Sequence, residues 1–235
     1  MSQFTHYLTL GFLWQGLLIA IEISAAAFFA ALPFALGLAL MRMSRSAVVR
    51  WLPVPFIWIM RGTPILLQLL FWYNALPAVG IHTSAITTAI IGMALNEIAF
   101  MAEIIRGGLL SIDDGQRLAA RALGMPPSSV FRRVVLPQLV RVIIPPAAND
   151  FITMLKITSL ASVISLREIM TNTQAVISTT FQFAEWYTAA AIYYLVLVSI
   201  FMVLQSWLER RYVWLSQPVG APSRLAFLRS NTSAR

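Results

Sequence analysis

Long apolar segments alternate with short polar ones along most of this chain. The first covers residues 12–41 and is interrupted only by Glu22. The other four lie at 53–76, 85–105, 134–156 and 186–208. A helix needs about 20 apolar residues to cross a bilayer. The pattern therefore predicts an all-α, polytopic membrane protein with about five transmembrane helices.

The composition agrees with this pattern. Hydrophobic residues make up 59% of the 235 residues, charged residues only 11%, and the mean hydropathy is +0.77. A soluble domain of this size could not hide so much apolar surface from water, whereas a bilayer accepts it. The chain has no cysteine, and His6 and His82 lie far apart, so neither a disulfide framework nor a metal site is predicted.

Three other segments receive separate predictions. Residues 106–133 are too charged for a span and contain several glycines and prolines, which predicts short helices outside the membrane, one ending near Gly124. The apolar segment at 134–156 contains three prolines and is predicted to be a broken helix. Residues 158–182 are amphipathic and Ser/Thr-rich, and are expected to pack at the outer side.

The domain boundaries follow from the last span. A transmembrane domain is expected over residues 1–215, and the Pro/Ser-rich residues 216–235 are expected to form a flexible cytoplasmic tail. Within the first span, alanines recur at every fourth position between Ala27 and Ala39. This stripe indicates either close contact with another helix or a chance pattern in an Ala-rich segment.

Positive charge predicts the orientation. The net charge is +8, and the arginines lie mainly in the gaps between apolar segments instead of forming the dense patch of a nucleic-acid-binding face. Cytoplasmic loops of membrane proteins are rich in Lys and Arg. The distribution places the N-terminus outside, and the loops at 42–52 and 106–133 and the C-terminus in the cytoplasm. The first positive residue is Arg42, so a cleaved signal peptide is not expected.

A set of spaced residues in the charged loop resembles a known signature. Ala119 and Ala120 are followed by Gly124 and then by Leu136 and Pro137. This spacing is similar to the cytoplasmic signature of binding-protein-dependent ABC importer permeases. Leu118 departs from it, because Glu usually precedes the two alanines, and the leucine removes a polar contact.

Further blocks resemble the branch of these permeases that serves polar amino acids (the histidine, glutamine and arginine type). They are residues 61–64 (Arg-Gly-Thr-Pro) with Gln68, residues 102–108, residues 136–138 and residues 156–160. The blocks cover most of 60–168. Ile157 departs from the branch, which usually has Asp after the lysine.

The resemblance implies the permease fold of type I ABC importers, with a coupling helix in the loop at 106–133. The residues expected to couple the chain to an ATPase are Gly115, Gln116, Arg117, Ala119, Ala120, Arg121, Leu123 and Gly124. Arg117 and Arg121 are four residues apart, share one helix face and could pair with acidic groups on a partner.

The partners implied by the resemblance are ABC ATPase subunits, a second permease (a copy or a relative), an extracytoplasmic solute-binding protein and an amino-acid substrate, in the inner membrane of a bacterium. The chain is not expected to be an enzyme. A Walker A loop needs Gly-Lys, and Lys156, which is the sole lysine, follows Leu155. ATP and Mg²⁺ are therefore expected on the partner subunits, with no cofactor on this chain and no catalytic residue.

Polar residues at membrane depth are the candidates for substrate binding. They are Asn96, Glu97, Asn149, Asp150 and Lys156. Glu97 or Asp150 would receive the ammonium group of an amino acid, and Lys156 would attract its carboxylate. The alternatives are structural: helix capping after the prolines for Asn149 and Asp150, and snorkelling for Lys156.

Three other functions remain open at this point. A permease for another small solute (a sugar, a peptide or an anion) would share the coupling loop but lack the blocks at 61–64 and 156–160. A membrane-embedded enzyme, or another protein without a transport function, would need a different constellation, and no suitably spaced His pair, Cys or acid cluster is present. A transporter working alone is disfavoured by the coupling signature and by the absence of a visible inverted repeat.

Overall fold

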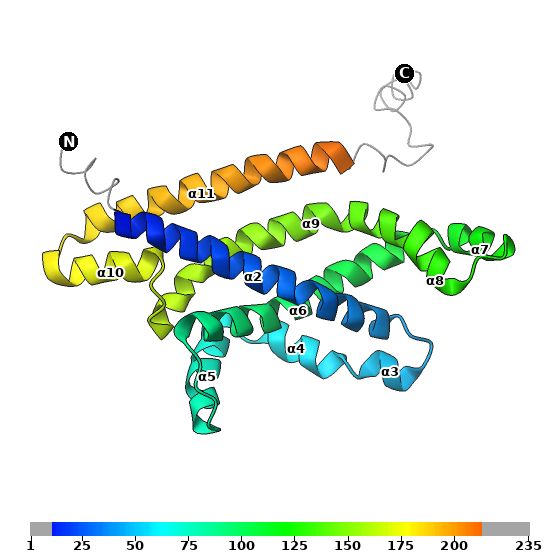
Figure 1. The fold of residues 1–235 in the computed structure, drawn as a ribbon, viewed down its shortest axis with the longest axis horizontal. Coiled ribbons are helices and arrows are strands. Elements are labelled where there is room, and N and C mark those ends of the chain that lie inside the picture. Colours follow the sequence, from blue (N-terminus) through cyan, green and yellow to red (C-terminus); the bar gives the residue numbers. More distant parts are fainter. Residues whose placement is uncertain (1–10, 213–235) are drawn as a thin grey trace, which may run out of the picture.

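Four long helices lie side by side along the longest axis of the molecule in the computed structural model (Figure 1), which describes residues 11–212. They are α2 (Gly11–Arg42), α6 (Ala85–Ser111), α9 (Leu136–Ile157) and α11 (Phe183–Tyr212). Every regular element within the described residues is helical. The expected all-α class is confirmed, whereas the tail at 216–235 lies outside the described residues.

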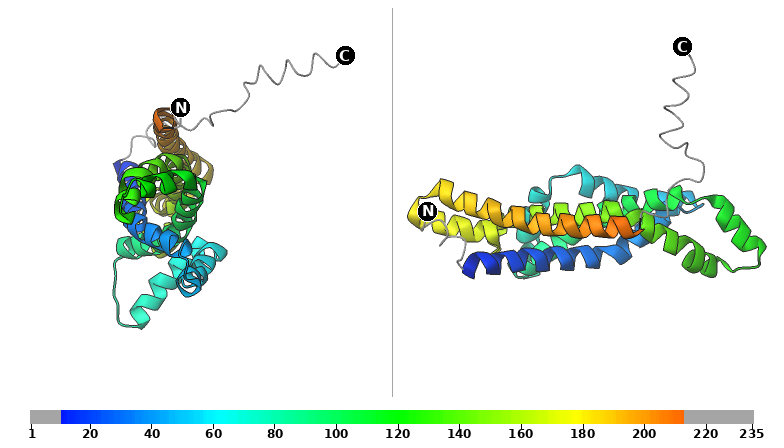
Figure 2. Two further views of the ribbon diagram at one scale, coloured as in Figure 1. Left: turned by 90° about the vertical axis from the view of Figure 1, so that its right-hand side faces the viewer. Right: turned by 90° about the horizontal axis from the view of Figure 1, so that it is seen from above.

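Shorter elements occupy the two ends of this bundle (Figure 1 and Figure 2). At one end lie α7 (Asp114–Ala122), α8 (Pro127–Val130) and the π-helical turn η1 (Phe131–Val135). At the opposite end lie the 3-10 helix η2 (Thr158–Ile164) and α10 (Ile169–Thr180). The short helices expected at 106–133 are present, and the position of 158–182 at the outer side of the membrane stays a prediction.

The predicted spans map onto these helices. By length and apolar composition, α2, α6 and α11 can each cross a membrane. A fourth passage comes from the pair Ala47–Gly62 and Ile65–Ala78, if this bent pair is one span. The 22 residues of α9 extend about 33 Å and lie alongside the others (Figure 1). Within residues 11–212, three helices, or four with the bent pair, are thus long and apolar enough to span a membrane, and the fifth span expected at 134–156 stays a prediction.

The alanine stripe of α2 is a helix contact. Ala27, Ala31, Ala35 and Ala39 are all fully buried, and α2 packs more extensively against α6 than any other two elements pack together. Small side chains let two helix backbones approach closely. The contact between α6 and α9 is close as well, because a Cβ added at Gly108 of α6 would lie 2.7 Å from Cγ2 of Ile143 on α9.

The segment expected as one span at 53–76 is instead two helices that meet at 106°. After α3 (Ala47–Trp51), α4 (Val54–Gly62) ends at Thr63 and α5 (Ile65–Ala78) begins after Pro64. A proline disfavours helical dihedrals in the residue before it, and Thr63 is extended, with φ −110° and ψ 145°. The bend points α5 away from the bundle (Figure 1).

Two side-chain amides satisfy the backbone at this bend. Gln68 Nε2 donates to the carbonyl oxygens of Met60 (2.8 Å) and Thr63 (3.1 Å) and to Thr63 Oγ1 (2.8 Å). Asn96 Nδ2, from α6, donates to the same Met60 oxygen (3.0 Å) and to Gln68 Oε1 (3.1 Å). Carbonyl groups freed inside a membrane protein need such partners, because the hydrocarbon supplies none.

The expectation of a broken helix at 134–156 is wrong. Helix α9 is continuous, with Pro137 in its first turn and Pro145 and Pro146 in its interior. The missing N–H of Pro137 would be unpaired anyway in a first turn. Interior prolines are tolerated in membrane helices because packed neighbours support the helix, and α9 packs against α6 and α11. Asn149 and Asp150 therefore lie mid-helix, and the capping role considered for them is excluded.

A buried carboxylate attaches α10 to the bundle. Glu168 is fully buried and caps the N-terminus of α10, accepting hydrogen bonds from the backbone N–H groups of Met170 and Thr171, both at 2.8 Å. Tyr194 Oη on α11 donates to the same carboxylate at 2.7 Å. On the other side, Asn172 Nδ2 donates to the Phe12 carbonyl of α2.

The bend depends on Gln68 and Asn96 together. Gln68→Leu and Asn96→Leu each remove one hydrogen-bond donor from the Met60 carbonyl oxygen. Each substitution should therefore lower the free energy of unfolding by about 1–3 kcal/mol. Because both amides serve one carbonyl, the double variant should lose less than the sum. Thermal unfolding in detergent, monitored by tryptophan fluorescence, measures the stability of the two single variants and of the double variant. Asn74→Leu is the control, because among residues 11–212 the exposed Asn74 amide donates only to Leu70 on its own helix. Equal losses in Gln68→Leu and Asn74→Leu would refute the role of the amide.

Candidate functional site

A small cavity lies where the start of α5, the middle of α6 and the second half of α9 meet. Its volume is about 80 Å³. The lining residues are Ile65, Met93, Asn96, Glu97, Phe100, Asp150, Thr153, Met154 and Ile157. The structure thus brings together three of the five predicted substrate-binding residues: Asn96, Glu97 and Asp150.

Two carboxyl groups from different helices face each other in this cavity. Glu97 on α6 is 4% exposed, and its carboxyl group is within hydrogen-bonding reach of Asp150 on α9. Neither the buried Glu97 Oε1 nor the buried Asp150 Oδ2 has an N–H or O–H donor within the described residues. A pair of carboxylates can only accept hydrogen bonds, so the pair needs a shared proton or a bound cation.

The surroundings favour a cation over an anion. No basic residue is among those that line the cavity, and its walls are otherwise mainly apolar. The amide N–H groups of Asn96 are directed to Met60 and Gln68, so this residue positions the bend and leaves only its oxygen for a ligand. In a dry site a group with several N–H donors, such as an ammonium, satisfies two carboxyl groups well.

The other two candidates lie outside the cavity. Asn149 and Lys156 are both exposed on α9, and neither is among the lining residues. The sequence reasoning missed Thr153 and Phe100, which do line it. Their helical spacing could have revealed them, because Thr153 follows Asp150 by three residues and Phe100 follows Asn96 by four.

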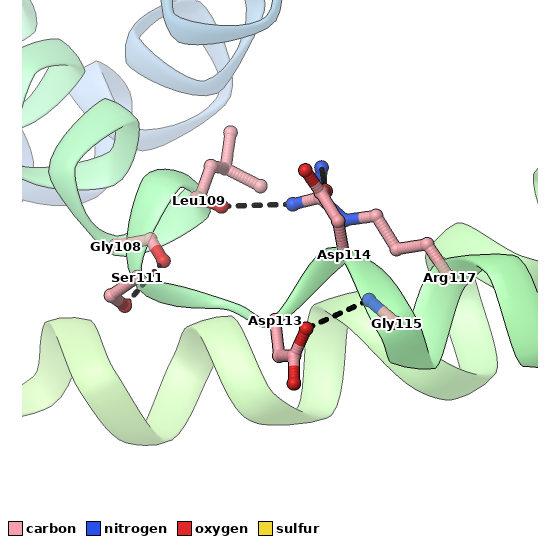
Figure 3. A network of polar contacts seen from close by, with 7 residues as sticks. All are labelled: Gly108, Leu109, Ser111, Asp113, Asp114, Gly115 and Arg117. Atoms are coloured by element: carbon pink, nitrogen blue, oxygen red, sulfur yellow. Dashed lines mark hydrogen bonds and ion pairs between the residues drawn. The ribbon is translucent and has the colours of Figure 1, made fainter.

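The coupling helix expected at 106–133 is α7. Its N-terminus is capped by Asp113, whose Oδ1 accepts from the Gly115 N–H at 2.8 Å (Figure 3). Its C-terminus turns at Gly124, which has φ +77°, with Met125 N–H donating to Ala120 O and Gly124 N–H to Arg121 O. This Schellman arrangement needs a left-handed residue, which glycine adopts without strain.

Side chains attach α7 to two long helices. Arg117 Nη2 donates to the Leu109 carbonyl of α6 at 2.8 Å, and its Nη1 lies 3.3 Å from Asp114 Oδ1 (Figure 3). Gln116 Oε1 accepts from Gln138 Nε2 on α9 at 2.7 Å. Arg117 is therefore engaged within the chain, while the exposed Arg121 lines an open cavity of about 230 Å³ beside it.

The exposed surface of α7 and its C-terminal turn is partly apolar. Leu118 is 64% exposed and Leu123 is 83% exposed, and Ala119 and Ala122 are exposed as well. Leu118, which departs from the usual Glu, thus adds to an apolar surface at the end of the molecule. Exposed apolar groups gathered on one short helix are typical of a protein contact.

Comparison with known proteins identifies the family. Residues 31–214 match the model of the "binding-protein-dependent transport system inner membrane component" family. The chain is 36% identical over 198 residues to the probable amino-acid ABC transporter permease protein YckA of Bacillus subtilis, covering 84% of this chain and 88% of that one. It is 38% identical over 226 residues to the octopine transport system permease protein OccM of Rhizobium radiobacter, covering 85% and 91%.

Solved structures agree with the fold. The chain superposes with a TM-score of 0.78, at 35% identity, on a chain from the crystal structure of an amino acid ABC transporter with histidines, covering 86% of this chain and 94% of that one. A chain of the MetNI methionine ABC transporter, 19% identical, shares the fold with a TM-score of 0.71 and covers 90% and 99%. The chain therefore belongs to the family of binding-protein-dependent transport system inner membrane components.

Proposed function

We propose that this chain is the permease subunit of an ATP-driven amino-acid importer. The observation that carries the proposal is the pair of carboxyl groups, Glu97 and Asp150, in a cavity next to a bent helix. Transporters bind solutes near the membrane midplane, where irregular backbone borders a cavity. The names of the similar permeases support the substrate class. An anion permease would need basic residues in the lining, and this cavity has none.

In this proposal Glu97 and Asp150 receive the ammonium group of the substrate. A pocket for a whole small molecule usually measures at least about 300 Å³, and this cavity has about 80 Å³. It therefore fits a charged head group, and the remainder of the amino acid would extend toward a second permease subunit. Lys156, exposed at the end of α9, would attract the carboxylate as the solute approaches.

The proposed complex contains two permeases, two ATPase subunits and an extracytoplasmic binding protein. The ATPase subunits would hold ATP and Mg²⁺ and would dock on the apolar surface of Leu118 and Leu123. Because α7 is bonded to both α6 and α9 through Arg117 and Gln116, a movement of the docked subunit would reach the cavity between those two helices. In this assembly α7 faces the cytoplasm and α10 faces outward.

The first experiment tests the carboxyl pair. Glu97→Gln and Asp150→Asn keep the shape of each side chain but remove its charge. Each should reduce amino-acid uptake by the reconstituted complex by about 10- to 100-fold, since a hydrogen bond to a charged group is worth about 1.5–3 kcal/mol. Uptake of labelled amino acids into proteoliposomes measures the effect. Asn149→Ala, which changes the exposed neighbour of Asp150, should leave uptake intact. The site is disproved if both acidic variants transport as the control does.

The second experiment tests docking at the turn after α7. Gly124 and Gly80 both have positive φ (+77° and +82°) and open space around an added Cβ. Gly124→Trp and Gly80→Trp therefore impose similar backbone strain, but only the first places an indole beside α7. Gly124→Trp should lose the ATPase subunits during purification while still inserting in the membrane. Recovery of ATPase with Gly124→Trp equal to that with Gly80→Trp would rule out docking here.

The third experiment tests the orientation. The chain lacks cysteine, so single cysteine variants report without background. Ser178→Cys on the exposed side of α10 should react with a membrane-impermeant maleimide added to intact cells with a permeabilised outer membrane. Ser128→Cys on α8 should react only after the inner membrane is opened. Labelling in the reverse order would invert the proposed topology.

A further inference from the structure

A second polar pocket is lined by the end of α2, by helix α4 and by the latter half of α6. It is an open pocket of about 380 Å³. Its lining includes Arg42, Val54, Ile57, Trp58, Arg61 and Glu103. It shares no lining residue with the Glu97–Asp150 cavity, and the proposed transport function does not use it.

The pocket contains more positive than negative charge. Its single carboxylate, Glu103, is already paired outside the lining, because Arg106 Nη2 and Nε bind its Oε2 at 2.8 and 2.9 Å. Arg61 stacks 5.1 Å from the centre of the Phe100 ring and forms no ion pair with any described residue. Two guanidinium groups, of Arg42 and Arg61, therefore face the pocket without a full counter-charge.

One ion pair beside the pocket is buried and lacks a hydrogen bond. The Nε of Arg42 lies 3.6 Å from Oε1 of Glu103, which is too long for a hydrogen bond. Neither atom has another hydrogen-bond partner among the described residues. Both atoms are closed off from solvent, but the Arg42 side chain as a whole is 25% exposed and Arg61 is exposed. A ligand that suits these two guanidinium groups carries anionic oxygens.

The position of the pocket matches the lipid headgroup region. Arg42 is the last residue of α2, at the end of the first span that faces α7. Trp58 lines the pocket and is 74% exposed, and Trp51, at the end of α3, is 62% exposed. Exposed tryptophans gather where headgroups meet acyl chains. Val54 and Ile57 add an apolar wall that suits the start of an acyl chain.

We propose that this pocket binds the headgroup of an anionic phospholipid of the inner leaflet, of the phosphatidylglycerol type. The phosphate oxygens accept hydrogen bonds from the guanidinium groups of Arg42 and Arg61. Trp58 covers the glycerol and the upper acyl chain. Basic pockets between transmembrane helices on the cytoplasmic side are suited to anionic lipid headgroups. The bound lipid would join α2, α4 and α6 at the base of the bent span.

Native mass spectrometry of the full-length chain, released from nanodiscs, tests this site. The nanodiscs contain equal amounts of phosphatidylglycerol, phosphatidic acid and phosphatidylcholine. Phosphatidylglycerol and phosphatidic acid should each be retained at least about tenfold more than the zwitterionic phosphatidylcholine. Equal retention of all three lipids would overturn the proposal.

Single substitutions in the pocket test whether the lipid binds there. Arg42→Gln should reduce phosphatidylglycerol retention about tenfold, whereas Arg45→Gln, which changes an exposed arginine outside the lining, should not. Trp58→Ala removes an exposed side chain, so it should fold normally and still lose retention. Unchanged retention in both Arg42→Gln and Trp58→Ala would overturn the site. Displacement of the lipid by 10 mM inorganic phosphate would show that the pocket binds free anions and would also overturn the proposal.

Discussion

The structure depends on a constraint at the bend between α4 and α5: carbonyl groups released inside the membrane must be bonded by the protein itself. Gln68 and Asn96 meet this need at the Met60 carbonyl. Because Asn96 belongs to α6, the same bonds fix the bend against the helix that carries Glu97. The start of α5 thereby becomes a wall of the carboxyl-lined cavity through Ile65.

Close packing of α2 and α6 makes the bundle a firm support for this arrangement. The fully buried alanines of α2 let the two helices run in contact over much of their length. At Gly108, the absence of a side chain lets α6 and α9 approach each other closely. Helix α7 is bonded to both α6 and α9 at the other end. The cavity and the coupling helix are therefore connected through the same two helices. In the proposed complex this connection would link ATP hydrolysis on a partner subunit to the proposed solute site.

The helical class and the positions of most helices could be predicted from the sequence, because they depend on residues close together in the chain. Hydrophobic length identifies a span without reference to any neighbour, and the helical class, the position of α7 and its stop at Gly124 all followed from residues close together in the chain. The carboxyl candidates Glu97 and Asp150 were also found in this way, since an ionisable residue inside an apolar segment stands out by itself.

The tertiary structure decided what depends on residues far apart. Residues 61–64 indicated a motif, but at the 106° bend the Met60 carbonyl accepts from Gln68 nearby and from Asn96, which is 36 positions away in the chain. Conversely, Pro145 and Pro146 suggested a break that does not occur, because packing against α6 and α11 supports a membrane helix with interior prolines. Helical spacing put Arg117 and Arg121 on one face, but only the approach of α6 showed that Arg117 is bonded internally and that Leu118 and Leu123 face outward. The sequence determined which segments are helices and which polar residues lie within them, whereas contacts between helices decided which of those residues meet.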